Sequence, residues 1–192
     1  YNDLDDYKYC VNGGFLSKLE TVNARAKGFS NRANYIAFKF MFENKAAIFK
    51  QGTAFAGSLN LRCKQITDKH CKVLAPALSE MKAMERLNLS ENQIGDVGLE
   101  HLSKALPEMK AMVRLNFYFN QFGDAGLQHL SKALPEMSAL KRLDLDKNLI
   151  GDAGLEHLSK ALPEMKALER LGLTYNQIGE EAKSKFKQEW VK

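Results

Sequence analysis

The chain has 192 residues, of which 45% are hydrophobic and 27% are charged, and its formal net charge is +5. This length suits one domain, or one domain with an arm, and the composition is typical of a soluble globular protein. The uncharged apolar runs are all much shorter than the ~20 residues that a membrane-spanning helix requires, which excludes a transmembrane segment. The modest positive charge permits acidic partners, and because no nucleic-acid-binding module accompanies it, we expect no nucleic-acid partner.

The first segment, residues 1–58, holds more than half of the aromatic residues and is predicted to be a mainly helical arm or cap. Helices are expected around 15–27 and over 32–50. The second is apolar on more than one face, so it must be buried on several sides. In one interpretation, the arm covers the exposed edge of the next segment.

A second interpretation has the arm dock into a partner protein through three of its aromatic residues, Tyr35, Phe38 and Phe42. A third makes the second helix an interfacial membrane helix, with its lysines at the surface and its phenylalanines in the lipid. Whether Tyr1 is the native or a processed start is left open by the sequence.

A repeat with a period of 28 residues comes after the arm, and repeats of this length indicate a stack of similar units. The segment MERLNLSENQIGDVGLEHLSKALPEMKA spans 84–111, close copies occupy 112–139 and 140–167, and a partial copy ends the series. A weaker copy begins at residue 59. Two columns align without a gap: Leu87, Leu115, Leu143 and Leu171, and Asn92, Asn120, Asn148 and Asn176.

The pattern LxxLxLxxNxIGDxGLxxLxxALPxM resembles the leucine-rich repeats, and its length and GDxG turn resemble the ribonuclease-inhibitor subtype. The resemblance covers 59–182, about two thirds of the chain. It implies an α/β solenoid with a short curved parallel sheet inside and helices outside, because one coil cannot bury its own apolar faces. We expect repeats over 59–178 and a lysine-rich capping helix over 179–192.

Each repeat position has a predicted physical role. Leu87 and Leu89 alternate as in a strand and should both face the core. Asn92 should hydrogen-bond unpaired backbone groups of the turn, forming a ladder from coil to coil. Asp96 is predicted to cap its own helix, and Gly98 to let helix and strand approach closely.

The first and last copies depart from the pattern. Lys64 replaces the ladder asparagine and Pro76 falls inside the expected helix, so we expect an irregular first coil. In the last copy, Lys183 replaces a helix leucine, and Phe186 and Trp190 take the places of two more.

The concave face of the predicted sheet carries the candidate binding residues. Adjacent strands lie roughly 4.8 Å apart, so one column of arginines forms a positive stripe: Arg86, Arg114, Arg142 and Arg170. In one interpretation nearby acids compensate this charge, namely Glu85, Glu169, Asp144 and Asp146. In the other, a carboxylate-bearing partner binds there, and aromatic side chains anchor it: Tyr118, Phe119, Phe122 and Tyr175.

Features that indicate chemistry are weak. A column of histidines, His101, His129 and His157, lies on helices expected about 8–10 Å apart, too far for neighbours to share a metal ion. The cysteines, Cys10, Cys63 and Cys71, match no zinc, redox or disulfide spacing, and their odd number favours an intracellular, reducing compartment, either the cytoplasm or an organelle. Cys71 is expected to be buried. We find no catalytic motif and expect neither enzyme activity nor a metal or cofactor.

The leading hypothesis is a non-catalytic protein–protein interaction module that binds its partner through the concave face and the arm. The alternative is a peripheral structural subunit that stabilises a large membrane complex, of which an organellar photosynthetic or respiratory complex is an example. A third rests on the resemblance alone, since some proteins of this repeat subtype activate the GTPase Ran, and would make the chain a GTPase regulator.

Overall fold

The computed structural model describes residues 57–79 and 81–190. The predicted arm, with Tyr35, Phe38 and Phe42, therefore lies outside the described residues except for Gly57 and Ser58.

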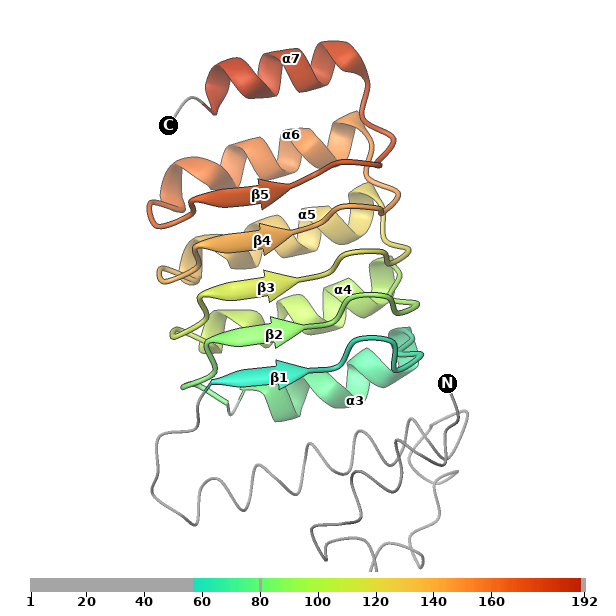
Figure 1. The fold of residues 1–192 in the computed structure, drawn as a ribbon, viewed down its shortest axis with the longest axis vertical. Helices are drawn as coiled ribbons and strands as arrows, with labels where there is room; N and C mark the ends of the chain where they lie inside the picture. Colours follow the sequence, from blue (N-terminus) through green and yellow to red (C-terminus); the bar gives the residue numbers. More distant parts are fainter. Residues whose placement is uncertain (1–56, 80, 191–192) are drawn as a thin grey trace, which may run out of the picture. The chain divides into compact units, whose positions relative to one another are not determined.

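Five short parallel strands form one sheet in the order β1-β2-β3-β4-β5 (Figure 1). The 28-residue period is preserved in the register, since Leu87 pairs with Leu59 on one side and with Leu115 on the other. A strand and the helix after it form one coil, and each coil places its strand beside the previous one. The strands are β1 (Ser58–Asn60), β2 (Arg86–Asn88), β3 (Arg114–Asn116), β4 (Arg142–Asp144) and β5 (Arg170–Gly172).

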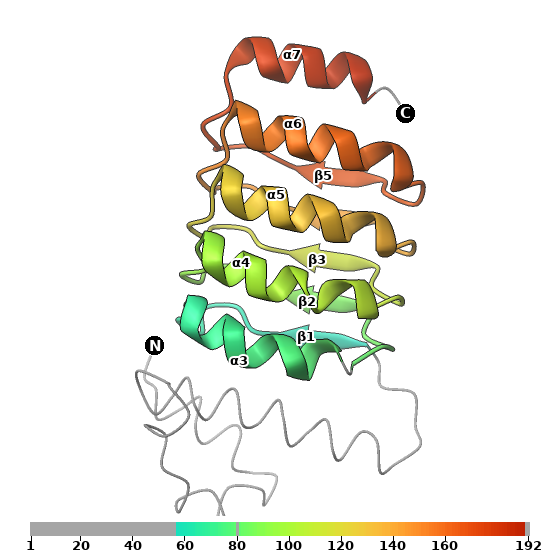
Figure 2. The same cartoon turned by 180° about the vertical axis from the view of Figure 1, so that it is seen from behind.

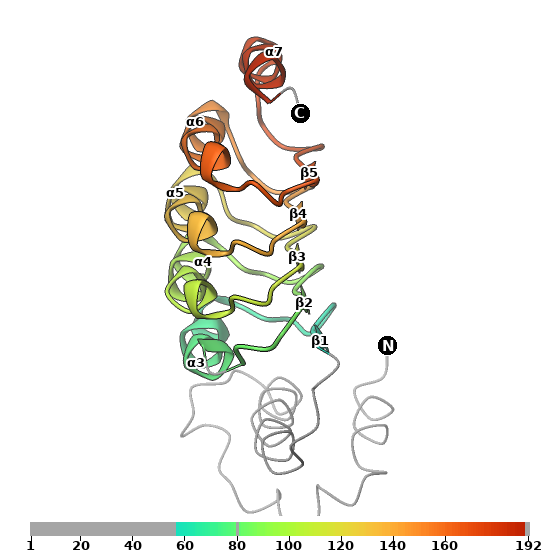
Figure 3. The ribbon, with the colours of Figure 1, turned by 90° about the vertical axis from the view of Figure 1, so that its left-hand side faces the viewer.

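The helices form a second layer on one face of the sheet (Figures 2 and 3). This is the predicted α/β repeat architecture. The α-helices are α3 (Asp68–Ser79), α4 (Asp96–Ser103), α5 (Asp124–Ala133), α6 (Asp152–Ala161) and α7 (Glu180–Glu189). In the second to fourth coils, a 3₁₀ turn containing the repeat proline comes after the helix: η3 (Leu106–Glu108), η4 (Leu134–Glu136) and η5 (Leu162–Glu164).

The core between the layers consists of apolar columns that run from coil to coil. Leu87, Leu115 and Leu143 are at most 1% exposed, as the repeat predicts. In the third coil the larger Phe117 and Phe122 fill the core and meet edge to face, with ring centroids 5.9 Å apart. Burial of these columns, which no coil achieves alone, is the main source of stability.

The asparagine ladder is present. The Asn92 amide donates to the carbonyl oxygens of Leu61 and Leu89. Its oxygen accepts from the backbone of Lys64 and Ile66 in the first coil. Each such side chain therefore satisfies buried backbone groups of its own coil and of the coil before it. A lysine can occupy position 64 in place of the asparagine because the Asn92 side chain already hydrogen-bonds the backbone of the first coil as well as that of its own coil.

The prediction that each aspartate caps its own helix is wrong. Asp96 is the first residue of α4, after Gly95. Its carboxylate accepts from the next coil, from the backbone N–H of Gly123 at 2.7 Å and of Gly126 at 2.9 Å. The aspartate column thus joins neighbouring coils, and each carboxylate lies at the N-terminus of the next helix, where the helix dipole favours negative charge.

Two other sequence expectations need correction. A Cβ on Gly98 would lie 2.4 Å from the Asp68 carboxylate and 3.1 Å from the Asp68 Cα. The lack of a side chain at Gly98 therefore allows α4 to approach the start of α3 in the preceding coil, more than it allows α4 to approach a strand. The first coil is not irregular in its helix, because α3 continues through Pro76.

The fifth coil is less completely covered than the others. Leu171 and Leu173 are half-buried, whereas Leu143 and Leu145 are fully buried. The helix α7 follows this coil, and none of its described side chains is buried. It carries Ala182 where α4, α5 and α6 carry glycine, so it cannot approach the aspartate of the preceding coil as closely.

Candidate protein-interaction surface

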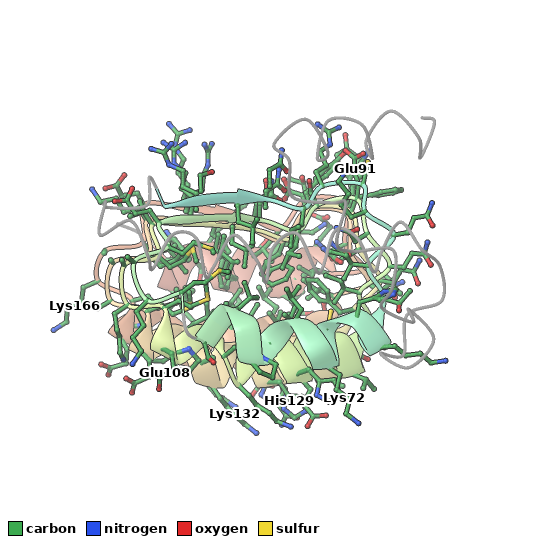
Figure 4. All side chains as sticks on the ribbon, turned by 90° about the horizontal axis from the view of Figure 1, so that it is seen from below. Lys72, Glu91, Glu108, His129, Lys132 and Lys166 are labelled. Carbon is green, nitrogen blue, oxygen red and sulfur yellow. The ribbon has the colours of Figure 1, made fainter. Side chains whose placement is uncertain are left out.

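The sheet face that points away from the helices, which we call the strand face, corresponds to the predicted concave face. Glu91 lies on this side of the molecule in Figure 4, and Lys72, His129 and Lys132 lie on the opposite, helical side. Strand residues alternate between the two sides, which buries the leucines and exposes their neighbours. The strand face carries two columns of functional interest, one where the strands begin and one where they end.

The arginine column consists of Arg86, Arg114, Arg142 and Arg170, the first residues of β2 to β5. All four are exposed and each is the register partner of the next. Unit charges 4 Å apart interact with about 1 kcal/mol in bulk water and with more near a protein surface. The column therefore concentrates positive charge on a narrow strip.

Three of the four acids expected to compensate this charge interact with other groups. Glu169 pairs with Lys141 at 3.2 Å. Asp146 accepts from the Thr174 backbone at 2.6 Å, and Asp144 accepts from the Asp146 backbone. Burial raises the pKa of Asp144 above its usual value. Within 57–79 and 81–190, no carboxylate lies within ion-pair distance of the arginine column, so an acidic partner would meet unpaired guanidinium groups.

The left-handed column lies just past the ends of the strands. Its members each have a backbone φ between 52° and 56°, a conformation that non-glycine residues rarely adopt: Cys63, Glu91, Phe119, Lys147 and Tyr175. Backbone hydrogen bonds maintain it, for example from Phe119 N–H to the Asp146 carbonyl at 2.9 Å. Left-handed residues cost roughly 1–2 kcal/mol each, and such strain concentrates at functional sites.

An aromatic strip, formed by Tyr118, Phe119 and Tyr175, surrounds Lys147. The Lys147 Nζ lies 5.4 Å from the Tyr118 ring centre, 5.7 Å from that of Phe119 and 5.4 Å from that of Tyr175. Phe119 is 55% exposed and Tyr175 78% exposed. Hydrogen bonding to the Tyr118 oxygen raises the pKa of Lys147. The arrangement is an accessible cation–π cluster.

Sequence reasoning placed Phe122 in this strip, and that assignment is wrong. Phe122 is 0% exposed because it occupies the column of Ile94 and Ile150, which points into the core. The alignment of the repeats already indicated a buried position, because Phe122 aligns with an isoleucine in the neighbouring copies. Sequence reasoning did not single out Lys147, which lies over all three rings of the strip.

A polar cluster ends the left-handed column near the first coil. The Arg62 guanidinium pairs with Glu91 at 2.6 Å, and the Cys63 thiol donates to the same carboxylate at 2.8 Å. The Cys63 and Arg62 hydrogen bonds lower the pKa of Glu91, and the interaction with Glu91 raises the pKa of Cys63. A raised pKa disfavours the reactive thiolate, so this cysteine is a poor nucleophile. Cys71 is fully buried, as expected.

The helical face carries charged side chains and a column of histidines. His101, His129 and His157 are half-exposed on successive helices. Three lysines of these helices pair with a glutamate one turn earlier: Lys104 with Glu100 at 2.7 Å, Lys160 with Glu156 and Lys183 with Glu180. Across the described part of the chain, no three His, Cys, Asp or Glu residues could together hold a metal ion. Within the same residues, no helix combines the length and apolar character needed to span a membrane.

Comparisons with known proteins agree with this geometry. The family model described as Leucine Rich repeat matches residues 83–103 and 137–159. The chain is similar to the solved tropomodulin C-terminal domain from Caenorhabditis elegans, with a TM-score of 0.63 and 16% identity over 77% of this chain and 90% of that one. It is also similar to the structure of leiomodin-1 actin-binding site 2, with a TM-score of 0.59 and 16% identity over 77% and 85% of the two chains.

A search of curated proteins found no match. At 16% identity, the structural likenesses show the fold alone. The ribonuclease-inhibitor subtype stays a prediction. The matched segments and the 28-residue register show that the chain contains leucine-rich repeats, and the layered fold is that of a leucine-rich-repeat solenoid.

Proposed function

We propose that the chain is a non-catalytic protein–protein interaction module whose strand face binds a partner that carries exposed carboxylates. The single observation that supports this most is the arginine column, four exposed guanidinium groups in register with no carboxylate of the described residues in ion-pair distance. Arginine is favoured at interfaces because its planar group forms paired hydrogen bonds with a carboxylate.

The aromatic strip supplies the second half of the proposed surface. Tyrosine and arginine are the residue types most enriched in interface hot spots, together with tryptophan. The rings of Phe119 and Tyr175 are exposed on a backbone whose left-handed conformation is the same in every coil. A rigid backbone reduces the entropy lost when these rings are immobilised by a partner.

The comparisons support this proposal at the level of the fold. The leiomodin-1 structure is described as an actin-binding site, so this fold presents a protein-binding surface there. The contribution of Tyr35, Phe38 and Phe42 to binding, and a reducing intracellular compartment, stay predictions.

Site-specific photo-crosslinking in cells that make the protein would test the proposal. The substitution Phe119→benzoylphenylalanine places the crosslinker on the strand face. The matched control is His129→benzoylphenylalanine, on the helical face. We expect one defined crosslinked partner from position 119 and none from position 129. Equal crosslinking from both faces would contradict the proposal. Several subunits of one large complex, captured together, would instead favour the structural-subunit hypothesis.

Charge reversal then tests the role of the arginines. The double variant Arg114→Glu/Arg142→Glu should weaken binding to the crosslinked partner by at least about 30-fold, because each reversal replaces attraction with repulsion. The control Lys72→Glu/Lys132→Glu makes the same change in net charge on the helical face (Figure 4) and should change the affinity by less than about twofold. Equal weakening by the two double variants would show that only net charge matters.

A further inference from the structure

The outer edge of β5 exposes backbone groups that the inner strands use to pair with the next coil. In the fourth coil, the Leu145 N–H donates to the Gly172 carbonyl at 3.0 Å and the Lys147 N–H to the Thr174 carbonyl at 2.9 Å. The equivalent groups in the fifth coil are the N–H of Leu173 and of Tyr175. Neither has a partner among residues 57–79 and 81–190. An unpaired edge of this kind is a template for another strand.

Two cavities flank this edge. One, of about 540 Å³, lies between the edge of β5 and α7, and its lining includes Arg170, the acids Asp144 and Asp146, and the core-side leucines Leu171 and Leu173. The other, of about 390 Å³, lies on the side of the core and is mainly apolar, with Leu162, Met165 and Leu168 in its lining.

Phe186 and Trp190 of α7 line both cavities. These rings lie 5.7 Å apart, centre to centre. The edge of β5 thus borders a cavity that the side chains of an added strand can enter, as strand addition requires.

The register specifies which side chain a sixth strand would place at each point. A residue beside Arg170 would face an exposed guanidinium group without a described carboxylate partner, which favours an acidic residue. The next residue would lie beside the half-buried Leu171, which lines the larger cavity together with Phe186 and Trp190. The position beside Gly172 is hollow, and a Cβ there would lie 2.8 Å from Asp146 Oδ1 and 3.0 Å from Asp144 Oδ1. That position favours a long basic side chain, and the one after it, beside Leu173, an apolar one.

We propose that β5 is a docking edge for an extended peptide of a partner protein with the pattern acidic–apolar–basic–apolar, which adds a sixth parallel strand. The peptide backbone pairs with Leu173 and Tyr175. Its acidic residue pairs with Arg170, its basic residue reaches Asp144 and Asp146, and its apolar residues enter the larger cavity beside Leu171, Leu173 and Trp190. This site lies at the last strand of the described sheet and shares Arg170 with the arginine column, but its backbone pairing does not depend on the proposed function of the strand face.

The test uses the full chain and the peptide acetyl-ALSELKLT-amide, which copies residues 167–174 with serine, glutamate and lysine at the places of Glu169, Arg170 and Gly172. Trp190, the one tryptophan of the chain, lies in both cavities and reports binding by fluorescence, with calorimetry as a second readout. We expect saturable binding. No saturable signal by either method would overturn the proposal.

N-methylated peptides test the backbone pairing. By the register, the peptide N–H groups of glutamate and lysine point toward β5, and those of the two adjacent leucines point away. N-methylation of glutamate or lysine should weaken binding at least about tenfold, and N-methylation of the leucines by less than about threefold. Equal effects at both sets would exclude strand addition.

A charge swap tests the register. The substitution Arg170→Glu should weaken binding of the original peptide at least about tenfold. The same variant should bind more tightly to a peptide that has lysine in place of the glutamate. Arg86→Glu, in the same column but far from β5, is the matched control and should leave both affinities unchanged. An equal loss in the two variants would show a general charge effect and contradict the proposal. Self-association of the chain that the peptide competes away would identify a second copy as the occupant, which would also overturn it.

Discussion

Leu143 in the fourth coil is fully buried, whereas Leu171, one period later at the same place in the fifth coil, is half-buried. The two leucines have similar neighbours in sequence, and both lie in strands that pair with the preceding strand. They differ in the segment that covers them. A complete coil covers Leu143, but only α7, with its alanine and lysine at core positions, covers Leu171. Burial in this fold is therefore supplied by the next coil.

Truncation of these two leucines gives the largest expected difference. Leu143→Ala should lower the free energy of unfolding by about 4 kcal/mol, because it removes a buried side chain and leaves a cavity. Leu171→Ala should lower it by about 1.5 kcal/mol, because water already reaches that side chain and the neighbours can relax. Urea denaturation followed by circular dichroism measures both values. Equal values for the two variants would show that α7 covers the fifth coil as fully as a complete coil would.

The apolar columns and the asparagine ladder could be predicted from the sequence because both repeat with the period of the chain. Leu87 and Asn92 each have a local role that a single repeat already specifies. The role of Asp96 could not be predicted in this way, since its partners Gly123 and Gly126 belong to the next coil. A local motif makes such an aspartate look like a helix cap.

The arginine column was likewise predictable as a column, but its lack of acidic partners was not. Glu169 is near Arg170 in sequence and yet pairs with Lys141, which depends on side-chain conformations that a pattern does not contain.

The aspartate contacts between coils give the next largest effect. Asp96→Ala should lower the free energy of unfolding by about 2 kcal/mol, because two backbone N–H groups lose a charged acceptor. Asp152→Ala should lower it by about 0.5 kcal/mol, because its bond to the Gly179 N–H at 2.7 Å is exposed and water can replace it. Asp96→Asn retains an acceptor and should recover at least half of the loss. Thermal unfolding of the three variants checks the order, and a larger effect at Asp152 would contradict the comparison.

The first coil offers the smallest and most local effect, through pH. His70 occupies the glycine position of the inner coils, and its Nδ1 accepts from the Thr67 N–H at 2.9 Å, at the start of α3. Burial lowers the pKa of His70. The folded state therefore favours the neutral ring more than the unfolded state does, and the unfolded state binds more protons near pH 6. Stability from this contact is complete above the unfolded pKa of about 6.5 and is lost as the pH falls below it.

We expect hydrogen exchange of the Thr67 amide, corrected for intrinsic rates, to become about threefold faster relative to that of Leu115 between pH 7.5 and pH 5.5. His70→Gln is the matched control, because glutamine at this position can accept the same N–H but does not titrate. It should remove the pH dependence at Thr67 while leaving protection at pH 7.5 nearly unchanged. If the first coil opens alone, its pH dependence must appear without a change in the neighbouring coils. A pH dependence that survives in His70→Gln, or that appears equally at Leu115, would therefore place the origin of the effect in the whole stack and not in the first coil.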